Sequence, residues 1–310
     1  MKIAVLIPCY NEELTIGKVI DDFRRELPEA DIYVYDNNSK DKTSEIARER
    51  GAIVKKEYRQ GKGHVVRSMF RDIDADCYIM IDGDDTYPSE FVHRLIEPIA
   101  KGEANMVIGD RLSNGTYRSE NKRAFHNLGN DMVRNLINKL FKSNLRDIMT
   151  GYRAFDREFV KGMPVLSPGF EIETEMSIHA LDKKFLIKEI PIDYRDRPEG
   201  SVSKLNTVSD GIKVMKTIFM LYKDYKPLMF FGVLTAIFLG LGLIVGLPVI
   251  IEFIKTRFIT KVPSAILAVG LIVLSTMSFT CGVILDTIVK QHRQMYELML
   301  NNIRSNLNKR

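Results

Sequence analysis

Two long apolar runs without a single charge constrain this chain more than any other feature of its sequence. Pro227–Ile251 and Val262–Leu285 are each longer than the roughly 20 residues that a helix needs to cross a bilayer. Two buried helices of a soluble core are the alternative, but such helices rarely continue for this length without a charge. Because only Glu252–Lys261 separates the runs, the pattern predicts a transmembrane hairpin whose two flanks lie on one side of the membrane.

The charges beside these runs predict the orientation of the hairpin. Lys204–Lys226 contains five lysines and two aspartates, and Lys290–Arg310 contains five basic residues and one glutamate. Positively charged flanks stay on the cytoplasmic side and attract anionic headgroups, although three basic residues in the connecting loop weaken the asymmetry. We therefore expect a multi-pass protein of the inner (plasma) membrane with its catalytic part and both termini in the cytoplasm.

The net charge of +5 arises at these membrane flanks, because residues 1–203 are slightly acidic. Basicity is therefore no argument for nucleic acid as a partner, and we expect none. The three scattered cysteines exclude a disulfide scaffold and fit a reducing compartment. Met1–Pro8 has the pattern of a short strand rather than of an export signal, so we expect the N-terminal part not to be exported.

Residues 1–195 alternate short β-branched runs with helical patterns, beginning with Ile3–Ile7 and a helix near Thr15–Leu27. This rhythm predicts an α/β fold with a mainly parallel sheet and helices on both faces. Ligands of such sheets bind at the carboxyl ends of the strands. Polar clusters stand at these predicted ends, namely Pro8–Glu12, Asp36–Thr43, Asp82–Asp85 and Gly109–Arg111.

The Asp82–Asp85 cluster, Asp-Gly-Asp-Asp, gives the strongest chemical signal. Carboxylates at positions i and i+2 after an apolar strand offer hard oxygen ligands for Mg²⁺ or Mn²⁺, which commonly share their coordination with substrate phosphates. A nucleotide diphosphate fits such a site, whereas an acidic turn that caps the next helix is the alternative. Gly61–His64 lacks the spacing of a P-loop, and no Gly-x-Gly-x-x-Gly follows the first strand, which disfavours an NTPase or a dinucleotide dehydrogenase.

Four motifs in order, Ile7–Glu12, Asp36–Thr43, Gly61–Gly63 and Asp82–Asp84, resemble the nucleotide-sugar half of a family 2 glycosyltransferase with the GT-A fold, which is Rossmann-like. Three later features narrow the resemblance to polyprenyl-phosphate glycosyltransferases of the dolichyl-phosphate mannose synthase type. They are the motifs Gly109–Arg111, Asp147–Arg153 and Arg197–Lys204, followed by the apolar runs. The motifs that carry the resemblance lie within residues 1 to about 210. The rest of the chain resembles the family only in having membrane helices after the catalytic domain.

The resemblance implies a role for each motif residue on the donor side. Carboxylates of Glu12 and Asp36 would accept hydrogen bonds from ribose hydroxyls and the uracil N–H. Lys62 lies between two glycines, which permit close approach to the nucleotide. For each of these residues a surface ion pair or a turn position is the alternative. The donor-binding residues implied in this way are Pro8, Tyr10, Glu12, Asp36, Lys62, Asp82, Arg197 and Lys204.

The same resemblance implies that Asp84 binds Mg²⁺ or Mn²⁺, with Asp85 beside it. Thr86 stands where mannose synthases often have a glutamine ligand, so ligation by Asp84, Asp85 or water stays open. Asn37 and Asn38 replace the usual Asp-Gly of the second motif. Because asparagine visits the left-handed region, we expect this turn to form, while its base contacts stay open.

The acceptor implied by the resemblance is a lipid phosphate. A phosphate monoester is largely ionised at pH 7 because its second pKa is about 6, so it needs positioning rather than a general base. Guanidinium groups suit this task. The implied acceptor residues are Arg111, Arg123 and Asn127, and the implied catalytic residues are Asp84, Arg111, Arg123 and Asp147.

Two acidic positions on the acceptor side keep alternatives. Asp147 would orient the acceptor or shape the site, and a role as catalytic base is less favoured. Glu171 and Glu173 would contact sugar hydroxyls or would be solvated helix residues.

The sequence divides into four segments. We expect a catalytic domain at 1–204, an amphipathic interfacial helix at 205–226, transmembrane helices at 227–251 and 262–289, and a basic cytoplasmic tail at 290–310. Packing of the amphipathic helix on the catalytic domain is the alternative. Gly240, Gly242 and Gly246 allow close helix contact, within the hairpin or between protomers of a homo-oligomer.

The resemblance implies inverting transfer of one sugar from UDP-glucose or UDP-N-acetylglucosamine to undecaprenyl phosphate at the cytoplasmic leaflet. A separate flippase and a downstream glycosyltransferase would then be required. A processive polysaccharide synthase is one alternative, but its Gln-x-x-Arg-Trp motif is excluded because the chain has no tryptophan. A catalytically silent nucleotide-sugar-binding membrane scaffold is the other.

Overall fold

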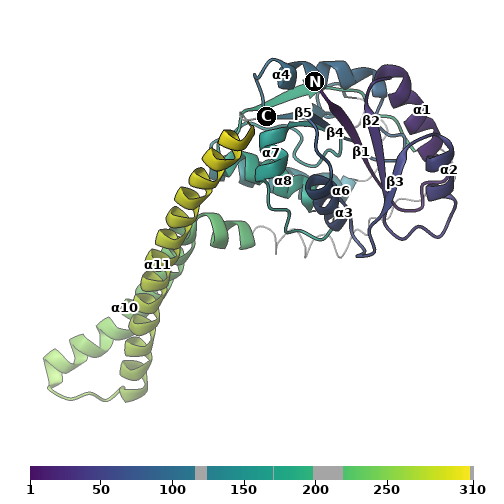
Figure 1. Ribbon diagram of the computed structural model, residues 1–310. Helices are drawn as coiled ribbons and strands as arrows, with labels where there is room; N and C mark the ends of the chain where they lie inside the picture. Colours follow the sequence, from purple (N-terminus) through teal and green to yellow (C-terminus); the bar gives the residue numbers. More distant parts are fainter. Residues whose placement is uncertain (116–123, 170, 198–218, 308–310) are drawn as a thin grey trace. The chain divides into compact units, whose positions relative to one another are not determined.

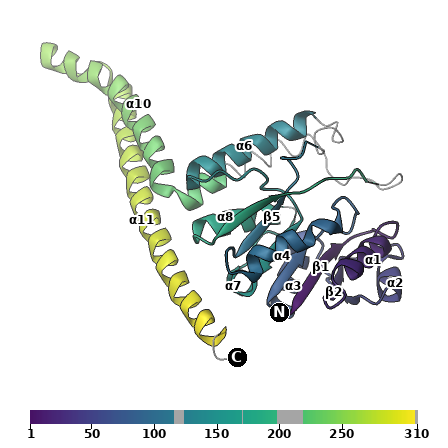
Figure 2. The same ribbon diagram turned by 90° about the horizontal axis from the view of Figure 1, so that it is seen from above.

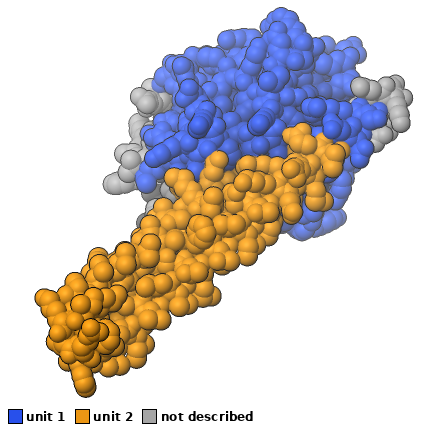
Figure 3. All heavy atoms as spheres, turned by 90° about the vertical axis from the view of Figure 1, so that its left-hand side faces the viewer, with its two compact units in different colours: residues 1–207, 299–310 blue, residues 208–298 orange. Residues whose placement is uncertain are grey.

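The computed structural model describes residues 1–115, 124–169, 171–197 and 219–307, with the backbone alone at 124–130 and 306–307. The chain divides into two compact units, one of residues 1–207 and 299–310 and the other of residues 208–298 (Figure 3). The predicted site residues Arg123 and Lys204, the side chain of Asn127 and positions 205–218 of the predicted amphipathic helix lie outside what the structure describes.

The first unit is built around one seven-stranded sheet in the order β3-β2-β1-β4-β6-β5-β7 (Figure 1). Its strands are β1 (Ile3–Cys9), β2 (Asp31–Asp36), β3 (Ile53–Lys56), β4 (Cys77–Met80), β5 (Met106–Asp110), β6 (Arg153–Asp156) and β7 (Ile187–Pro191). All neighbours pair in parallel except β6, which is antiparallel to both β4 and β5. The prediction of a mainly parallel sheet is therefore confirmed.

Helices lie on both faces of this sheet (Figures 1 and 2). They are α1 (Ile16–Glu26), α2 (Thr43–Glu49), α3 (Lys62–Asp72), the short 3₁₀ helix η1 (Ser89–Phe91), α4 (Val92–Ala100), α6 (Ala124–Phe141), α7 (Arg157–Gly162) and α8 (Ile172–Asp182). Apolar residues of α1 recur at helical spacing and enter one core cluster with α4 and with Val5 and Ile7 of β1. Ala4 and Leu6 alternate with them and are buried on the opposite face.

Strand register brings three of the predicted motifs to the same edge. Cys9 pairs with Asp36, and Leu6 pairs with Met80, so β1, β2 and β4 end side by side. The loops that follow these strands leave the sheet together. The parallel arrangement therefore places the predicted donor motifs at one end of the sheet, as expected for this fold class.

The second unit contains two helices long and apolar enough to cross a membrane, α10 (Pro227–Thr256) and α11 (Val262–Leu307). In the most apolar stretch of each helix, only 6% and 17% of the residues are buried. Both helices extend beyond the apolar runs, and α11 continues through most of the predicted tail. Residues 219–225 are also helical.

Small and hydroxyl residues bring α10 and α11 close together. A Cβ on Gly246 would lie 3.1 Å from the Ala268 Cβ, and Gly242 faces Ile272 at a similar distance, whereas Gly240 has open space around it. The Ser275 hydroxyl donates to the Thr235 carbonyl across the pair at 3.0 Å. Two of the three predicted glycines therefore contact the other helix of the hairpin.

Candidate active site

The loops after β1 and β2 are joined by a reciprocal set of hydrogen bonds. The Lys40 N–H donates to Asn11 Oδ1 at 2.8 Å, and the Glu12 N–H donates to Thr43 Oγ1 at 2.8 Å. Asn11 adopts a left-handed backbone with φ of 54°. Pro8 and Tyr10 are half-buried at this edge. The first two predicted donor motifs therefore form one surface.

Asp36 organises the second loop from inside. Its carboxylate is buried and accepts from the Ser39 N–H at 2.9 Å and the Ser44 hydroxyl at 2.8 Å. Asn37 fastens the loop before α3, because its Oδ1 accepts from the Gly61 N–H at 2.7 Å. Asn38 has φ of 65°, so the expectation that asparagine would sustain this turn is confirmed.

An ion triad, in which Lys62 and Glu173 are largely buried and Asp82 is half-buried, links the third and fourth motifs to α8. The Lys62 ammonium contacts Asp82 Oδ1 and lies 2.5 Å from Glu173 Oε1. Burial lowers the pKa of Lys62, but the two carboxylates outweigh this effect and raise it. Burial raises the pKa of Glu173. Glu173 is therefore not a solvated helix residue, whereas Glu171 is exposed.

Two glycines are required by close packing around this triad. A Cβ on Gly151 would lie 2.3 Å from Asp82 Oδ2, and a Cβ on Gly63 would lie 1.8 Å from the Ser167 carbonyl oxygen. Both separations are shorter than van der Waals contact. The Asp147–Arg153 motif and the Asp82–Asp85 cluster therefore meet directly, although Gly151 lies 69 positions after Asp82 in the sequence.

Asp84 lies inside the site and both of its oxygens have partners. Oδ1 accepts from the Thr86 hydroxyl at 2.7 Å, and Oδ2 accepts from Arg197 Nη2 at 2.5 Å. The Asp84 side chain is only 7% exposed, and this burial raises its pKa above the ordinary value. The Thr86 hydroxyl thus orients the Asp84 carboxylate.

Asp85 points elsewhere. Its backbone is left-handed with φ of 57°, and its carboxylate lies 2.6 Å from the Lys18 ammonium on α1. Among the described residues no group of three carboxylates, histidines or cysteines is arranged around a metal position. The buried Asp84 carboxylate still suits Mg²⁺ or Mn²⁺, because such ions bind through one or two carboxylates together with substrate phosphates and water.

Arg111 and Asp147 form a second ion pair beside Tyr87. Arg111 Nε donates to Asp147 Oδ2 at 2.9 Å, and Arg111 Nη1 donates to the Tyr87 hydroxyl at 3.2 Å. The same hydroxyl accepts from the Gly151 N–H at 3.2 Å. Asp147 is buried and its own N–H donates to Glu189 Oε1 at 3.0 Å. Asp147 therefore holds the Arg111 side chain in place.

Two residues of this region are absent from the sequence-based site. Tyr87 joins Arg111 to the Gly151 turn. Its position two residues after the Asp82–Asp85 cluster is the sequence signal that could have indicated a place in the site. Arg153 is fully buried and donates to the Ile148 carbonyl at 2.5 Å, the Thr150 carbonyl at 3.0 Å and the Ser177 hydroxyl at 2.9 Å. Burial lowers the pKa of Arg153 to about 10, so it stays charged at neutral pH.

Comparison with known proteins agrees with this geometry. Residues 4–163 match the family described as glycosyl transferase family 2. Glycosyltransferase AglJ of Haloferax volcanii is 33% identical over 297 residues, covering 94% of this chain and 95% of that protein. A dolichyl-phosphate hexose transferase of the same organism is 31% identical over 216 residues, covering 70% and 92%.

The fold also has a counterpart among solved structures. Glucosyl-3-phosphoglycerate synthase from Mycobacterium tuberculosis, crystallised with Mn²⁺, UDP-glucose and phosphoglyceric acid, superposes with a TM-score of 0.57 at 22% identity, covering 72% of this chain and 79% of that one. The predicted resemblance in motifs and the predicted GT-A fold are thereby confirmed. The chain belongs to glycosyl transferase family 2 and is a glycosyltransferase.

Proposed function

We propose that this glycosyltransferase transfers one sugar from a uridine diphosphate sugar to a polyprenyl phosphate, with inversion at the anomeric carbon. One observation carries the proposal. The Arg111 guanidinium, suited to a phosphate, is connected through Tyr87 and Gly151 to Asp82, two residues before the Asp84 carboxylate. A cation for the acceptor and a carboxylate for the metal of the donor thus belong to one continuous site.

The donor side would use the sheet edge at which the four donor motifs lie. Glu12, Asp36 and Asp82 would bind the nucleoside with Pro8 and Tyr10 beside them, and Lys62 would keep Asp82 in position. Asp84 would hold Mg²⁺ or Mn²⁺. The bound ion would stabilise the negative charge of the diphosphate leaving group. Support comes from the buried, oriented Asp84 carboxylate and from the Mn²⁺ and UDP-glucose named for the mycobacterial synthase.

The acceptor side needs positioning rather than proton abstraction. An ionised phosphate oxygen would attack the anomeric carbon while the bond from that carbon to the diphosphate breaks, and the electron pair would leave with UDP. Arg111, held by Asp147, would orient the attacking phosphate. Arg197, whose guanidinium contacts the Asp84 carboxylate, would neutralise the departing diphosphate. Arg123, Asn127 and Lys204 remain candidates for the same two tasks.

The acceptor class and location rest on relatives and on the apolar helices. The names of two relatives, the dolichyl-phosphate hexose transferase and an undecaprenyl-phosphate mannosyltransferase of Micrococcus luteus that is 25% identical over 214 residues, specify lipid phosphates. We propose undecaprenyl phosphate as the acceptor and UDP-glucose or UDP-N-acetylglucosamine as the donor. The helices α10 and α11 would span the inner membrane with both termini cytoplasmic, and the segments would be those expected from the sequence.

The test is transfer by the purified full chain in detergent with Mn²⁺, undecaprenyl phosphate and a panel of radiolabelled nucleotide sugars. We expect one lipid-linked sugar from one donor. Asp84→Asn should abolish transfer, whereas Asp31→Asn, at the opposite end of β2, should retain it. A lipid that carries several sugars would favour the processive synthase. Failure to transfer or hydrolyse any donor would favour the silent scaffold and contradict the proposal.

A consequence of the proposal is that the glycolipid must be moved and used by other proteins. The hairpin carries two acidic residues, Glu252 near the end of α10 and Asp286, which pairs with Lys290 one turn away at 2.7 Å, and neither lies inside an apolar run. We therefore expect vesicles containing this chain alone to accumulate product only in the leaflet that faces the donor. Rapid appearance of product in the opposite leaflet would contradict the need for a separate flippase.

A further inference from the structure

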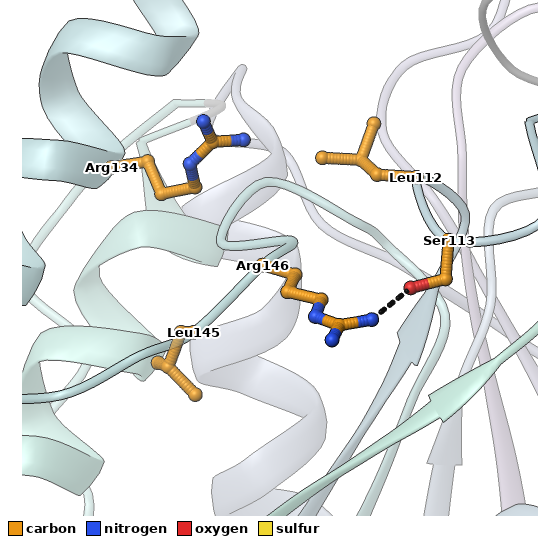
Figure 4. A pocket seen from close by; sticks show the side chains of 5 residues that line it. All are labelled: Leu112, Ser113, Arg134, Leu145 and Arg146. Atoms are coloured by element: carbon orange, nitrogen blue, oxygen red, sulfur yellow. Dashed lines mark hydrogen bonds between the residues drawn. The ribbon is translucent and has the colours of Figure 1, made fainter.

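A cavity of about 380 Å³ lies next to the Arg111–Asp147 pair and has no role in the chemistry described above (Figure 4). Its walls come from three places in the chain: the two residues that follow Arg111, the two that precede Asp147, and α6. The lining residues are Leu112, Ser113, Arg134, Leu145 and Arg146. Two guanidinium groups and two leucines therefore share one cavity of the size of a small-ligand site.

Arg146 brings a positive charge without a carboxylate partner within the described part of the chain. Its Nη1 donates to the Ser113 hydroxyl at 2.8 Å, the contact drawn in Figure 4. The Ser113 hydroxyl in turn donates to Asp110. A guanidinium has five N–H donors, so this single neutral contact leaves four for a ligand.

The backbone at Arg146 is fixed, which makes the position of this charge specific. The Arg146 N–H donates to Glu189 Oε1 at 2.8 Å, and the same oxygen accepts from the Asp147 N–H. Leu145 before it is buried, and its carbonyl accepts from Asn138 Nδ2 on α6 at 2.8 Å. The loop that carries Arg146 is therefore held to β7 and to α6.

Arg134 supplies the second guanidinium from α6. Its Nη2 lies 2.9 Å from Asp131 Oδ1, an i,i+3 pair in which the aspartate side chain is 49% exposed. Exposed pairs of this kind contribute little free energy. A ligand phosphate can therefore compete for Arg134, because a charge-assisted and bidentate guanidinium–phosphate contact is stronger.

The composition of the walls selects the chemical class of the ligand. Among the described residues, no aromatic ring lines the cavity to stack on a base, and no carboxylate or amide lines it to accept from sugar hydroxyls. Two guanidinium groups suit a phosphate. The side chains of Leu112 and Leu145 suit hydrocarbon attached to it.

We propose that the Arg134–Arg146 cavity binds the phosphate group of a lipid, at a position separate from the phosphate that reacts beside Arg111. The lipid nature of this ligand accords with the proposed function, on which the inference partly rests. Two sources share this chemistry: a polyprenyl phosphate on its way to Arg111, and the headgroup of an anionic phospholipid of the bilayer.

Binding measurements without any donor sugar test the proposal, so their result does not depend on sugar transfer. The variant is Arg134→Gln/Arg146→Gln in the full chain in detergent. The control, Arg48→Gln/Arg94→Gln, removes the same charge from exposed positions on α2 and α4. The probes are citronellyl phosphate by calorimetry, phosphatidylglycerol by native mass spectrometry, and inorganic phosphate.

We expect the variant to bind citronellyl phosphate or phosphatidylglycerol about tenfold more weakly, because charge-assisted hydrogen bonds are lost, while the control binds both normally. Loss for citronellyl phosphate identifies the polyprenyl phosphate as the source, and loss for phosphatidylglycerol identifies the headgroup. Unchanged binding of both lipids overturns the proposal. Inorganic phosphate that binds as tightly as citronellyl phosphate overturns the lipid class.

Two further measurements separate this site from its neighbours and from a loss of structure. UDP affinity should be unchanged in the variant, and an equal loss of UDP affinity would show that the cavity belongs to the donor site. Arg134→Lys/Arg146→Lys keeps both charges but loses the bidentate geometry, so its affinity should fall between those of the wild type and the glutamine variant. Equal thermal unfolding of all variants confirms that they are folded.

Discussion

Arg197 and a divalent metal ion should compete for Asp84. Asp84 Oδ2 accepts from Arg197 Nη2 at 2.5 Å, and Oδ1 accepts from the Thr86 hydroxyl. An ion that binds through Oδ2 competes with the guanidinium for that oxygen. Replacing Arg197 by glutamine removes the competitor and leaves the carboxylate more negative, so metal affinity in the absence of donor should rise.

The size of the effect follows from the contact. A hydrogen bond to a charged group contributes about 1.5–3 kcal/mol, and the Arg197 side chain is 28% exposed, so we take the lower end of that range. Because 1.4 kcal/mol corresponds to a factor of ten in affinity, Arg197→Gln should tighten donor-free Mn²⁺ binding about tenfold. Transfer should nevertheless slow, because Arg197 is proposed to neutralise the departing diphosphate.

Electron paramagnetic resonance of free Mn²⁺ measures this affinity directly in the detergent-purified chain. Arg195→Gln is the matched control, because Arg195 pairs with exposed Glu90 at 3.2 Å and not with the site. Affinity and turnover should move in opposite directions in Arg197→Gln and stay unchanged in the control. Mn²⁺ binding that is unchanged or weaker in Arg197→Gln would refute the competition.

Three other outcomes are expected. Lys62→Met should lower the stability of the first unit by about 3 kcal/mol, because it leaves the buried Glu173 carboxylate and the half-buried Asp82 carboxylate without their cation. Chemical denaturation should show no such loss for exposed Lys40→Met. Gly151→Ala should reduce UDP affinity at least tenfold by calorimetry, because its Cβ would overlap the Asp82 carboxylate; normal affinity would contradict the packing. Burial lowers the pKa of His179 from 6.5 to about 4, so the unfolded chain binds its proton more readily between these values and stability should fall as pH drops from 6.5 to 4. In His179→Gln this slope of the melting temperature should be reduced, and an unchanged slope would assign it to other groups.

Local patterns were sufficient to predict much of the donor side. The helix expected near Thr15–Leu27 lies at Ile16–Glu26, because apolar spacing and strand alternation depend on neighbours in sequence. Parallel strands must end at a common edge, so the motifs that follow them were expected to meet. The family resemblance followed from the same motifs, and the matching family confirms it.

The tertiary structure alone decided which of these residues become partners. Arg197 reaches Asp84 across 113 positions, and Glu173 joins Lys62 only because α8 packs beside the loop before α3. Asp85, next to Asp84 in sequence, faces Lys18 instead.

The central place of antiparallel β6 was likewise decided by the tertiary structure. This strand brings Arg153 into the core beneath the Asp147–Arg153 turn. The physical reason is that sequence periodicity encodes which side of an element is buried. The pairing of charges across elements depends on strand order and crossover packing, which no local pattern specifies.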